Sequence, residues 1–459
     1  MGVTEKFATF ALETTYDNLP ETVVSGTKRI LLESVAVMLL GSSLKLGKMI
    51  AEVSTKGVES PEAMLIGRSD KRSLRTAAFY NTAIADCNDS AGGYYQGIVH
   101  PGKNVAPASL TAASAKGKSG KDLILAMVLG IECYSRIDRV MATSHAARGF
   151  YDDGTVGTIG SVISVANLFG LDKGSFIGAI GNAALLAPCT LGGSNMFRSA
   201  ARPLTMGMAS ANSILAVMMA QGGVLGPSEI LECPGGFCHA LADLTDLKGV
   251  TDNLGKTWET PMYYHKPFVG CRLTHLARQG AKALKMKHDI KPDDIIHVTV
   301  RQAKGTLQVM SHHARVGANA VEHSCSGPYL VANILMYDDA GPGVLTEERM
   351  NDLKVHQLAD RIQIVEDPEL TRKWVTEHSR GGRIEIEMKG GEKYSYFGEH
   401  IKGDPLDEWR MTDAELEEKL RSFAFGILDS KTVEDILEMT SHLEQVDNTA
   451  KLMSLLTTK

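Results

Sequence analysis

The sequence predicts a mainly helical protein with a smaller α/β domain placed before its last helices. Three observations support this fold class: helical spacing of apolar residues over the first 260 residues, strand-like alternation between about 295 and 396, and helical spacing again after about 411. The chain of 459 residues is also too long to fold around one ordinary hydrophobic core. We therefore predict a helical domain from 1–265 and 403–459, and a smaller α/β domain from 266–402.

The helices of the larger domain are predicted from apolar spacing and end signals. Apolar residues between Ile30 and Leu39 lie at helical spacing, and Gly41 is expected to end that helix. Ser73 and Ser119 are expected to cap two further helices. Three later segments are apolar nearly all round, so we place them inside the domain. These segments are 154–170, 174–188 and 201–223.

The smaller domain is predicted from alternating apolar residues. Ile296, Val298 and Val300 alternate on one face of a strand, and a second strand is expected around 362–364. Two more alternating runs flank a Lys-Gly-Gly-Glu turn within 381–400, which is the strongest hairpin signal in the chain. Helices are expected between these strands, near 266–287 and 325–337.

Composition and charge exclude several functions. A net charge of −6 without a concentrated basic surface argues against nucleic-acid binding. No run of about 20 apolar residues lacks charge and no secretory signal is evident, so we expect no membrane span and a cytoplasmic location. The seven cysteines are scattered without a CxxC motif, which argues against a disulfide framework and a metal centre. A small anionic ligand stays compatible with this composition.

The polar stretch DCNDSAGGYYQGIVHPG interrupts the helical pattern between Asp86 and Gly102. Asp86 and Asp89 are three residues apart and share a helix face, and His100 follows a glycine-rich loop. A carboxylate beside an imidazole can tune its pKa for proton transfer. The alternative is a solvated helix end followed by an ordinary surface loop.

Three further stretches carry candidate residues. Arg198 and Arg202 could grip a carboxylate before an apolar helix, or could be surface arginines. The stretch 263–275 holds cationic, thiol and imidazole groups at the expected domain boundary, where ligand sites are frequent; the alternative is a hinge with solvated charges. Its histidines and cysteine lack a fourth ligand for zinc. Tyr329 could donate to a substrate oxygen, or could be a half-buried side chain.

Together these stretches resemble the MmgE/PrpD family of dehydratases, decarboxylases and epimerases. The resemblance covers almost the whole chain through NTAIADCNDS, HPG, GIECYSRI, GTVGTIG, RPLTMGMASANS, KPFVGCRLTH and SGPYLVA, in that order. It implies a large helical domain, a smaller α/β lid domain, a homodimer and a cofactor-free site between the domains. Three positions depart from the family pattern: Tyr151 replaces a histidine found in many members, Arg202 replaces a lysine, and Cys271 replaces a histidine of some decarboxylases.

We therefore predict a cofactor-independent lyase that dehydrates a small di- or tricarboxylic acid by abstracting a proton next to a carboxylate. Alternatives on the same scaffold are decarboxylation of a cis-aconitate-like acid and isomerisation or epimerisation; an alternative of another class is a non-catalytic, metabolite-binding helical dimer. In this hypothesis Asp86 orients His100, the leading base or acid. The predicted catalytic residues are Asp86, His100, Tyr151, Cys271, His275 and Tyr329. The predicted substrate-binding residues are Arg202, Lys266, Arg272 and Ser90.

Overall fold

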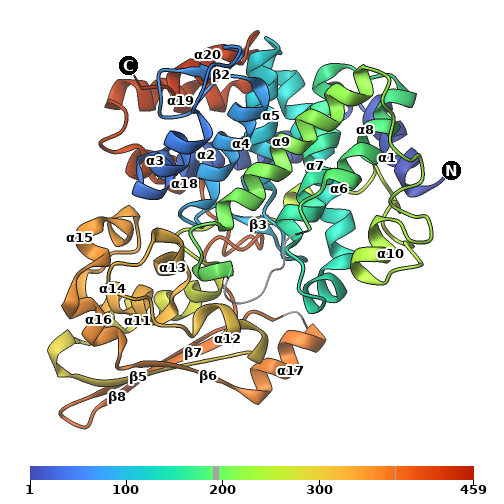
Figure 1. The fold of residues 1–459 in the computed structure, drawn as a ribbon. Helices are drawn as coiled ribbons and strands as arrows, with labels where there is room; N and C mark the ends of the chain where they lie inside the picture. The colour runs from blue at the N-terminus through green and yellow to red at the C-terminus, as the bar shows by residue number, and fades with distance from the viewer. Residues whose placement is uncertain (190–195, 378, 459) are drawn as a thin grey trace.

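A computed structural model describes residues 1–189, 196–377 and 379–458. It has a large helical body and a smaller α/β lid, which lies at the lower left in Figure 1. The helices of the body are α1 (Val3–Glu13), α2 (Glu21–Ser43), α3 (Lys45–Ser54), α4 (Leu74–Asp86), α5 (Pro101–Ala115), α6 (Gly120–Ala147), α7 (Asp152–Phe169), α8 (Lys173–Leu186), α9 (Arg202–Gln221), α10 (Phe237–Ala242), α18 (Asp413–Ala424), α19 (Ser430–Ser441) and α20 (Ala450–Leu455). The predicted fold class, mainly helical with a smaller α/β part, is confirmed.

The helix starts follow the predicted capping signals. The Ser73 side chain accepts the N–H of Thr76 at the start of α4, and Ser119 forms a capping box with Asp122 at the start of α6. The prediction for Gly41 is wrong, because this residue lies inside α2. A Cβ atom at Gly41 would lie 1.9 Å from the carbonyl oxygen of Ile84 in α4. Gly41 therefore permits close contact between two buried helices.

The lid is built around a four-stranded sheet of order β6-β5-β7-β8, at the bottom of Figure 1. Strands β5 and β6 are parallel, whereas β5–β7 and β7–β8 are antiparallel, the latter forming the predicted hairpin. The strands are β5 (Ile295–Gln302), β6 (Ile362–Glu366), β7 (Gly382–Met388) and β8 (Lys393–Gly398). The lid helices are α11 (His275–Lys287), α12 (Lys304–Met310), α13 (Ala320–Cys325), α14 (Gly327–Tyr337), α15 (Glu347–Met350), α16 (Leu353–Ala359) and α17 (Pro368–Glu377).

One predicted core residue of this sheet faces outward. The register of β5 against β7 shifts between Ile295 and His297, so Ile296 is the extra residue of an irregular pairing. Ile295 is buried and Ile296 is 51% exposed, while Val298 and Val300 are buried as predicted. A one-residue irregularity changes the face that a side chain occupies.

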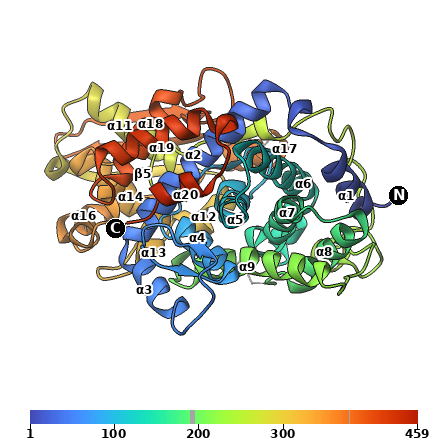
Figure 2. The ribbon, with the colours of Figure 1, turned by 90° about the horizontal axis from the view of Figure 1, so that it is seen from above.

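The C-terminal helices return to the helical body. Figure 2 shows α18, α19 and α20 beside α2 and α5. Lys419 of α18 donates to the buried Glu33 carboxylate of α2 at 2.7 Å. The domain boundaries at 265/266 and 402/403 stay predictions.

Within the described residues one helix, α9, is long and apolar enough to cross a membrane, and the bent pair α2–α3 passes the same test only if it is counted as one span. In the α9 window 72% of the residues are buried inside the protein. Such burial is typical of a core helix in a globular protein.

Candidate active site

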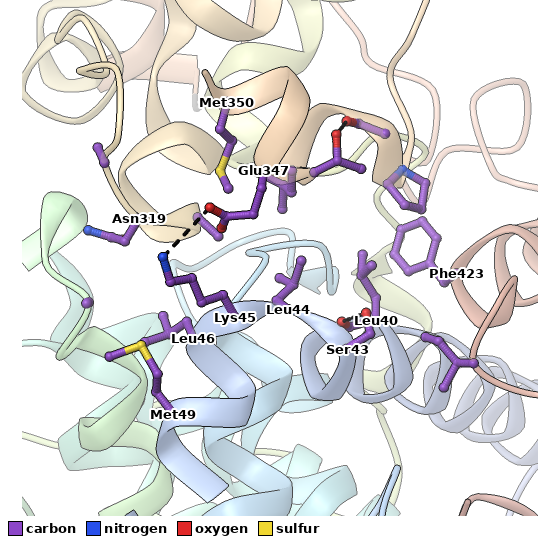
Figure 3. A pocket seen from close by; sticks show the side chains of 18 of the residues that line it. Leu40, Ser43, Leu44, Lys45, Leu46, Met49, Asn319, Glu347, Met350 and Phe423 are labelled. Atoms are coloured by element: carbon purple, nitrogen blue, oxygen red, sulfur yellow. Dashed lines mark hydrogen bonds and ion pairs between the residues drawn. The ribbon is translucent and has the colours of Figure 1, made fainter. Parts of the chain in front are cut away.

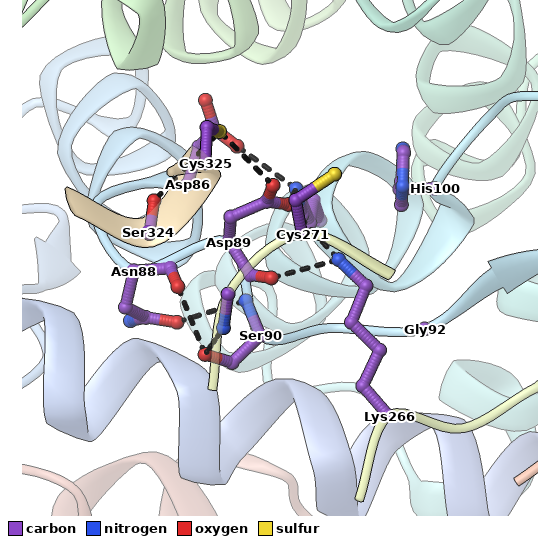
Figure 4. Close-up of polar contacts among 12 residues, drawn as sticks. Asp86, Asn88, Asp89, Ser90, Gly92, His100, Lys266, Cys271, Ser324 and Cys325 are labelled. Carbon is purple, nitrogen blue, oxygen red and sulfur yellow. Dashed lines mark hydrogen bonds and ion pairs between the residues drawn. The ribbon is translucent and has the colours of Figure 1, made fainter. Parts of the chain in front are cut away.

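The polar stretch after α4 is held between the body and the boundary segment of the lid. Its short strand β3 (Gly93–Tyr94) pairs with β4 (Tyr263–Tyr264); a second short pair joins β1 (Ala63–Met64) to β2 (Lys71–Arg72). Asp89 adopts a left-handed backbone conformation with φ 50°, which is uncommon outside glycine and occurs at strained functional positions. Figure 4 shows Asp86, Asp89 and His100 facing the boundary segment that carries Lys266 and Cys271. Folding thus joins residues far apart in sequence.

Five buried charged side chains form one network at this junction. Arg202, at the start of α9, binds Asp86 through Nε at 2.8 Å and Nη2 at 3.0 Å. Lys103 lies 3.0 Å from Asp86 and also contacts Asp89. Lys266 donates to the side chain of Asp89 at 3.0 Å and to its carbonyl at 2.7 Å. Three cations thus surround two carboxylates, which leaves one excess positive charge.

The pKa shifts in this network follow from these contacts. Burial alone would raise the pKa of Asp89, but Lys103 and Lys266 outweigh it and hold that pKa well below its usual range. Burial lowers the pKa of Lys266, although Asp89 opposes the shift. Arg202 stays a cation, since Asp86 and Asp89 overcome the effect of burial and raise its pKa. The contacts within the network therefore favour the ionised form of Asp89 and the cationic form of Arg202.

His100 lies beside this network but is paired with Asp153, which corrects the prediction that Asp86 orients it. Nδ1 of His100 is 2.8 Å from Asp153, and the backbone N–H of His100 donates to the same carboxylate at 2.8 Å. Tyr134 also donates to Asp153 at 2.7 Å. Asp86 is unsuited to the predicted role because Lys103 and Arg202 already occupy both of its oxygens.

The ring of His100 presents its other nitrogen as an acceptor. The charged contacts with His100 and Lys103 overcome burial and keep the pKa of Asp153 below its usual range. The ionised Asp153 accepts from Nδ1, so the neutral ring has a lone pair at Nε2, 3.4 Å from the Tyr264 hydroxyl. Burial lowers the pKa of His100, with Asp153 opposing the shift. The arrangement is that of a base, or of an acid after protonation.

Tyr151 and Cys271, two of the departures from the family pattern, lie near this centre. Burial and the nearby Asp153 raise the pKa of Tyr151, whose hydroxyl has no hydrogen-bond partner in the described parts of the chain. Cys271 is buried, and a hydrogen bond from the Cys325 thiol lowers its pKa. Arg202 contacts the Cys325 sulfur at 3.2 Å. Because the Tyr151 hydroxyl donates to no described residue, it is available as a proton donor to a ligand.

The predicted carboxylate-binding arginines already have acidic protein partners. Arg202 holds Asp86 in a two-pronged contact, so its guanidinium is already paired with a protein carboxylate. Arg272 forms an ion pair with the buried Asp404 and stacks over Tyr264 at 4.0 Å. Nη1 of Arg272 is buried without a hydrogen-bond partner in the described residues. Arg272 thus has an N–H group free to donate to a ligand, whereas Nε and Nη2 of Arg202 already donate to Asp86.

Three other predicted residues support the structure around the site. The Tyr329 hydroxyl donates to the carbonyl of Val344 at 2.6 Å, and its predicted role as a substrate donor stays a prediction. Nε2 of His275 lies 3.2 Å from the carbonyl of Gly270, and burial keeps the pKa of His275 well below its usual range. Ser90 accepts the N–H of Gly270 at 3.4 Å. His275 and Ser90 thus both hold the boundary segment.

Sequence reasoning missed Lys103 and Asp153. Lys103 follows the His-Pro-Gly motif in the first turn of α5, and Asp153 lies in YDDG at the first turn of α7. Charged residues in the first turns of otherwise apolar helices were the available signal. In the described ranges no group of three or more His, Cys, Asp or Glu side chains could hold a metal ion.

A separate groove of about 630 Å³ lies between the body and the lid, around the junction of α2 and α3. Figure 3 shows its apolar lining, including Leu44, Leu46, Met49 and Phe423, and an ion pair of 3.8 Å between Lys45 and Glu347. Both charged side chains are largely exposed. This groove lacks the buried charges of the His100 site.

A buried carboxylate paired with a partly exposed imidazole, beside an excess of cations, is typical of an enzyme that transfers protons on a carboxylic acid. The MmgE/PrpD N-terminal domain matches residues 5–249, and the MmgE/PrpD C-terminal domain matches residues 268–445. The chain therefore belongs to the MmgE/PrpD family and is a lyase of this type.

Two relatives match along nearly the whole chain. Cis-aconitate decarboxylase of Homo sapiens is 23% identical over 470 residues, covering 99% of this chain and 94% of the human protein. Cis-aconitate decarboxylase of Aspergillus terreus is 24% identical over 486 residues, covering 99% of this chain and 96% of the fungal protein. The likeness extends through both domains.

Proposed function

We propose that this chain decarboxylates a tricarboxylic acid resembling cis-aconitate, without a cofactor, and that His100 donates the proton. The observation that carries the proposal is the full-length similarity to cis-aconitate decarboxylases. The geometry around His100 is compatible with it, because Asp153 would stabilise the imidazolium form.

In the proposed reaction, the bond from the saturated arm of the substrate to its carboxylate breaks and carbon dioxide leaves. The released electron pair forms a new double bond, and the old double bond shifts its pair to the far alkene carbon. That carbon takes a proton from Nε2 of protonated His100, and solvent restores the proton. The excess positive charge of the network around Lys266 stabilises the developing anion.

Dehydration of a hydroxy acid is the second candidate. Burial lowers the pKa of His100, so the ring is neutral at pH 7 and can abstract a proton next to a carboxylate. The two reactions need opposite protonation states of His100. Activity that depends on the acid falls as pH rises through the pKa of His100, whereas activity that depends on the base rises.

The test is incubation with cis-aconitate and with citrate- and malate-like acids, followed by mass spectrometry for loss of carbon dioxide or of water. We expect carbon dioxide loss from cis-aconitate, and at least about a hundredfold lower kcat for His100→Ala. His313→Ala is the matched control, because His313 lies beside Asp360 on the surface. Unchanged turnover by His100→Ala contradicts the role of this histidine; loss of water alone favours the second candidate.

A further inference from the structure

A second group of cations lies on the lid side of His100. Tyr264, whose hydroxyl is 3.4 Å from Nε2 of His100, carries the Arg272 guanidinium on its ring face. Arg380, from the segment before β7, reaches toward the body and donates to the carbonyl of Gly97 at 3.4 Å. Burial and the neighbouring Arg272 lower the pKa of Arg380, as expected for two cations close together.

The positive charges of Arg272 and Arg380 are not fully neutralised by carboxylates of the described residues. Asp404 contacts Nη2 of Arg272, while Nη1 of Arg272 is buried without a partner in the described chain. Arg380 stacks over Trp374 at 4.2 Å, and no carboxylate of the described residues lies within ion-pair distance of it. Among the described residues, Asp404 thus pairs with Arg272 alone, and Arg380 has no carboxylate partner. Buried donors of this kind are normally satisfied, so the unpartnered Nη1 and the excess positive charge favour the binding of one more anion.

We propose that Arg272 and Arg380 bind a second carboxylate of the substrate, remote from the reacting carbon, and that Arg380 determines selectivity for tricarboxylates. The inference rests on the proposed function, since it concerns the substrate of the same site. Guanidiniums bind carboxylates through two parallel donors, which fixes orientation as well as charge. Tyr264 contacts both Arg272 and His100, so a substrate held by the arginines lies next to the imidazole.

The test uses two non-reacting probes and isothermal titration calorimetry. Propane-1,2,3-tricarboxylate carries three carboxylates, and methylsuccinate is the same molecule with one terminal carboxylate replaced by hydrogen. We expect Arg380→Gln to weaken binding of the tricarboxylate by about tenfold to a hundredfold and of methylsuccinate by less than about threefold. Arg380→Lys, which keeps the charge, should restore part of the selectivity.

Arg383→Gln is the matched control, because Arg383 is an exposed arginine on β7 that lies over Phe397. It should bind both probes as the wild type does. An equal loss for both probes in Arg380→Gln, no loss, or no tricarboxylate binding by the wild type overturns the inference. If the wild type decarboxylates cis-aconitate but Arg380→Gln binds the tricarboxylate as tightly as the wild type, the second carboxylate site is contradicted and the proposed reaction is not. If Arg380→Gln selectively loses tricarboxylate binding but the wild type does not decarboxylate cis-aconitate, the proposed reaction is contradicted and the carboxylate site is not.

Discussion

At the scale of single residues, Asp153 controls the proton affinity of His100. Its carboxylate raises the pKa of His100 against the effect of burial, so Asp153→Asn should lower that pKa further. For a reaction that needs the imidazolium, we expect kcat to fall by about a hundredfold and the pH at which activity declines to move lower. The measurement is kcat/KM between about pH 5 and 9, a range around the ordinary histidine pKa.

Asp360→Asn is the control for Asp153→Asn, because Asp360 lies 3.7 Å from His313 in an exposed pair. That variant should keep the wild-type profile. A wild-type profile in Asp153→Asn would show that the carboxylate does not act on the reacting histidine.

The sequence indicated the polar stretch that the structure places beside the buried charged network, but it did not indicate how His100 is paired there. Asp86 and His100 lie in one stretch, and their proximity along the chain suggested a pair. The actual partner of His100 comes from the start of α7, 53 residues away. Long-range pairing of this kind depends on how α5 and α7 pack, which residue spacing in one chain does not specify.

At the scale of elements, Gly41 sets the distance between α2 and α4. A methyl group there would meet the carbonyl of Ile84, a backbone atom that cannot move without shifting α4. Gly41→Ala should therefore lower the free energy of unfolding by about 1–3 kcal/mol, as overpacked cores do. Urea unfolding followed by circular dichroism measures it.

Gly174→Ala is the matched helix variant, because Gly174 is an exposed position of α8 with its nearest neighbouring atom at 3.5 Å. It should be neutral or stabilising by up to about 1 kcal/mol. Equal effects of the two substitutions would mean that helix propensity, and not contact between α2 and α4, governs both.

Most elements could be predicted from apolar spacing, because burial of one helix face or one strand face leaves a periodic signal. The predictions fail where a residue pattern that usually marks a helix end or a buried strand face arises for another reason. Gly41 resembles a helix end but serves helix contact, and Ile296 follows the strand alternation but sits at an irregular pairing. Both depend on neighbouring elements, which periodicity within one segment does not report.

At the scale of the whole molecule, Glu33 joins the two ends of the chain and the boundary segment. It is buried, and it contacts Lys419 at 2.7 Å, His265 at 3.2 Å and the backbone N–H of Lys266 at 3.0 Å. Burial would raise the pKa of Glu33, but Lys419 and His265 outweigh it and lower the pKa below the usual 4.5. Because the folded-state pKa is depressed, this contribution to stability is present above about pH 4.5 and is lost as pH falls.

Glu33→Gln should lower the free energy of unfolding by about 3–5 kcal/mol at pH 7, since it leaves Lys419 buried and unpaired. Unfolding curves between about pH 7 and 4 should show less loss on acidification than in the wild type. The double variant Glu33→Gln/Lys419→Met should be less destabilised than Glu33→Gln alone. A double variant at least as unstable as the single one contradicts the pairing argument.

The surface of α9 and α3 predicts self-association. Leu204 and Met208 of α9 and Met49 and Val53 of α3 are 39–69% exposed and line a groove of about 780 Å³. The homodimer implied by the family resemblance stays a prediction, and this exposed apolar patch is the surface on which we expect two copies to meet. Sedimentation velocity at micromolar concentration should give the mass of a dimer, and Met208→Glu should shift it toward the monomer. A wild-type monomer contradicts the proposal.

The contact between Lys419 and Glu33 spans 386 positions of the chain. A ribosome adding ~5–20 residues per second needs about twenty to eighty seconds to make that intervening stretch. During this interval Glu33 of α2 lacks its partner Lys419 of α18. The core around Glu33 therefore forms only near the end of translation. In a newly made chain, the side of α2 that packs against α18 therefore stays uncovered for most of the synthesis, while α4 and α5 can already cover its other sides.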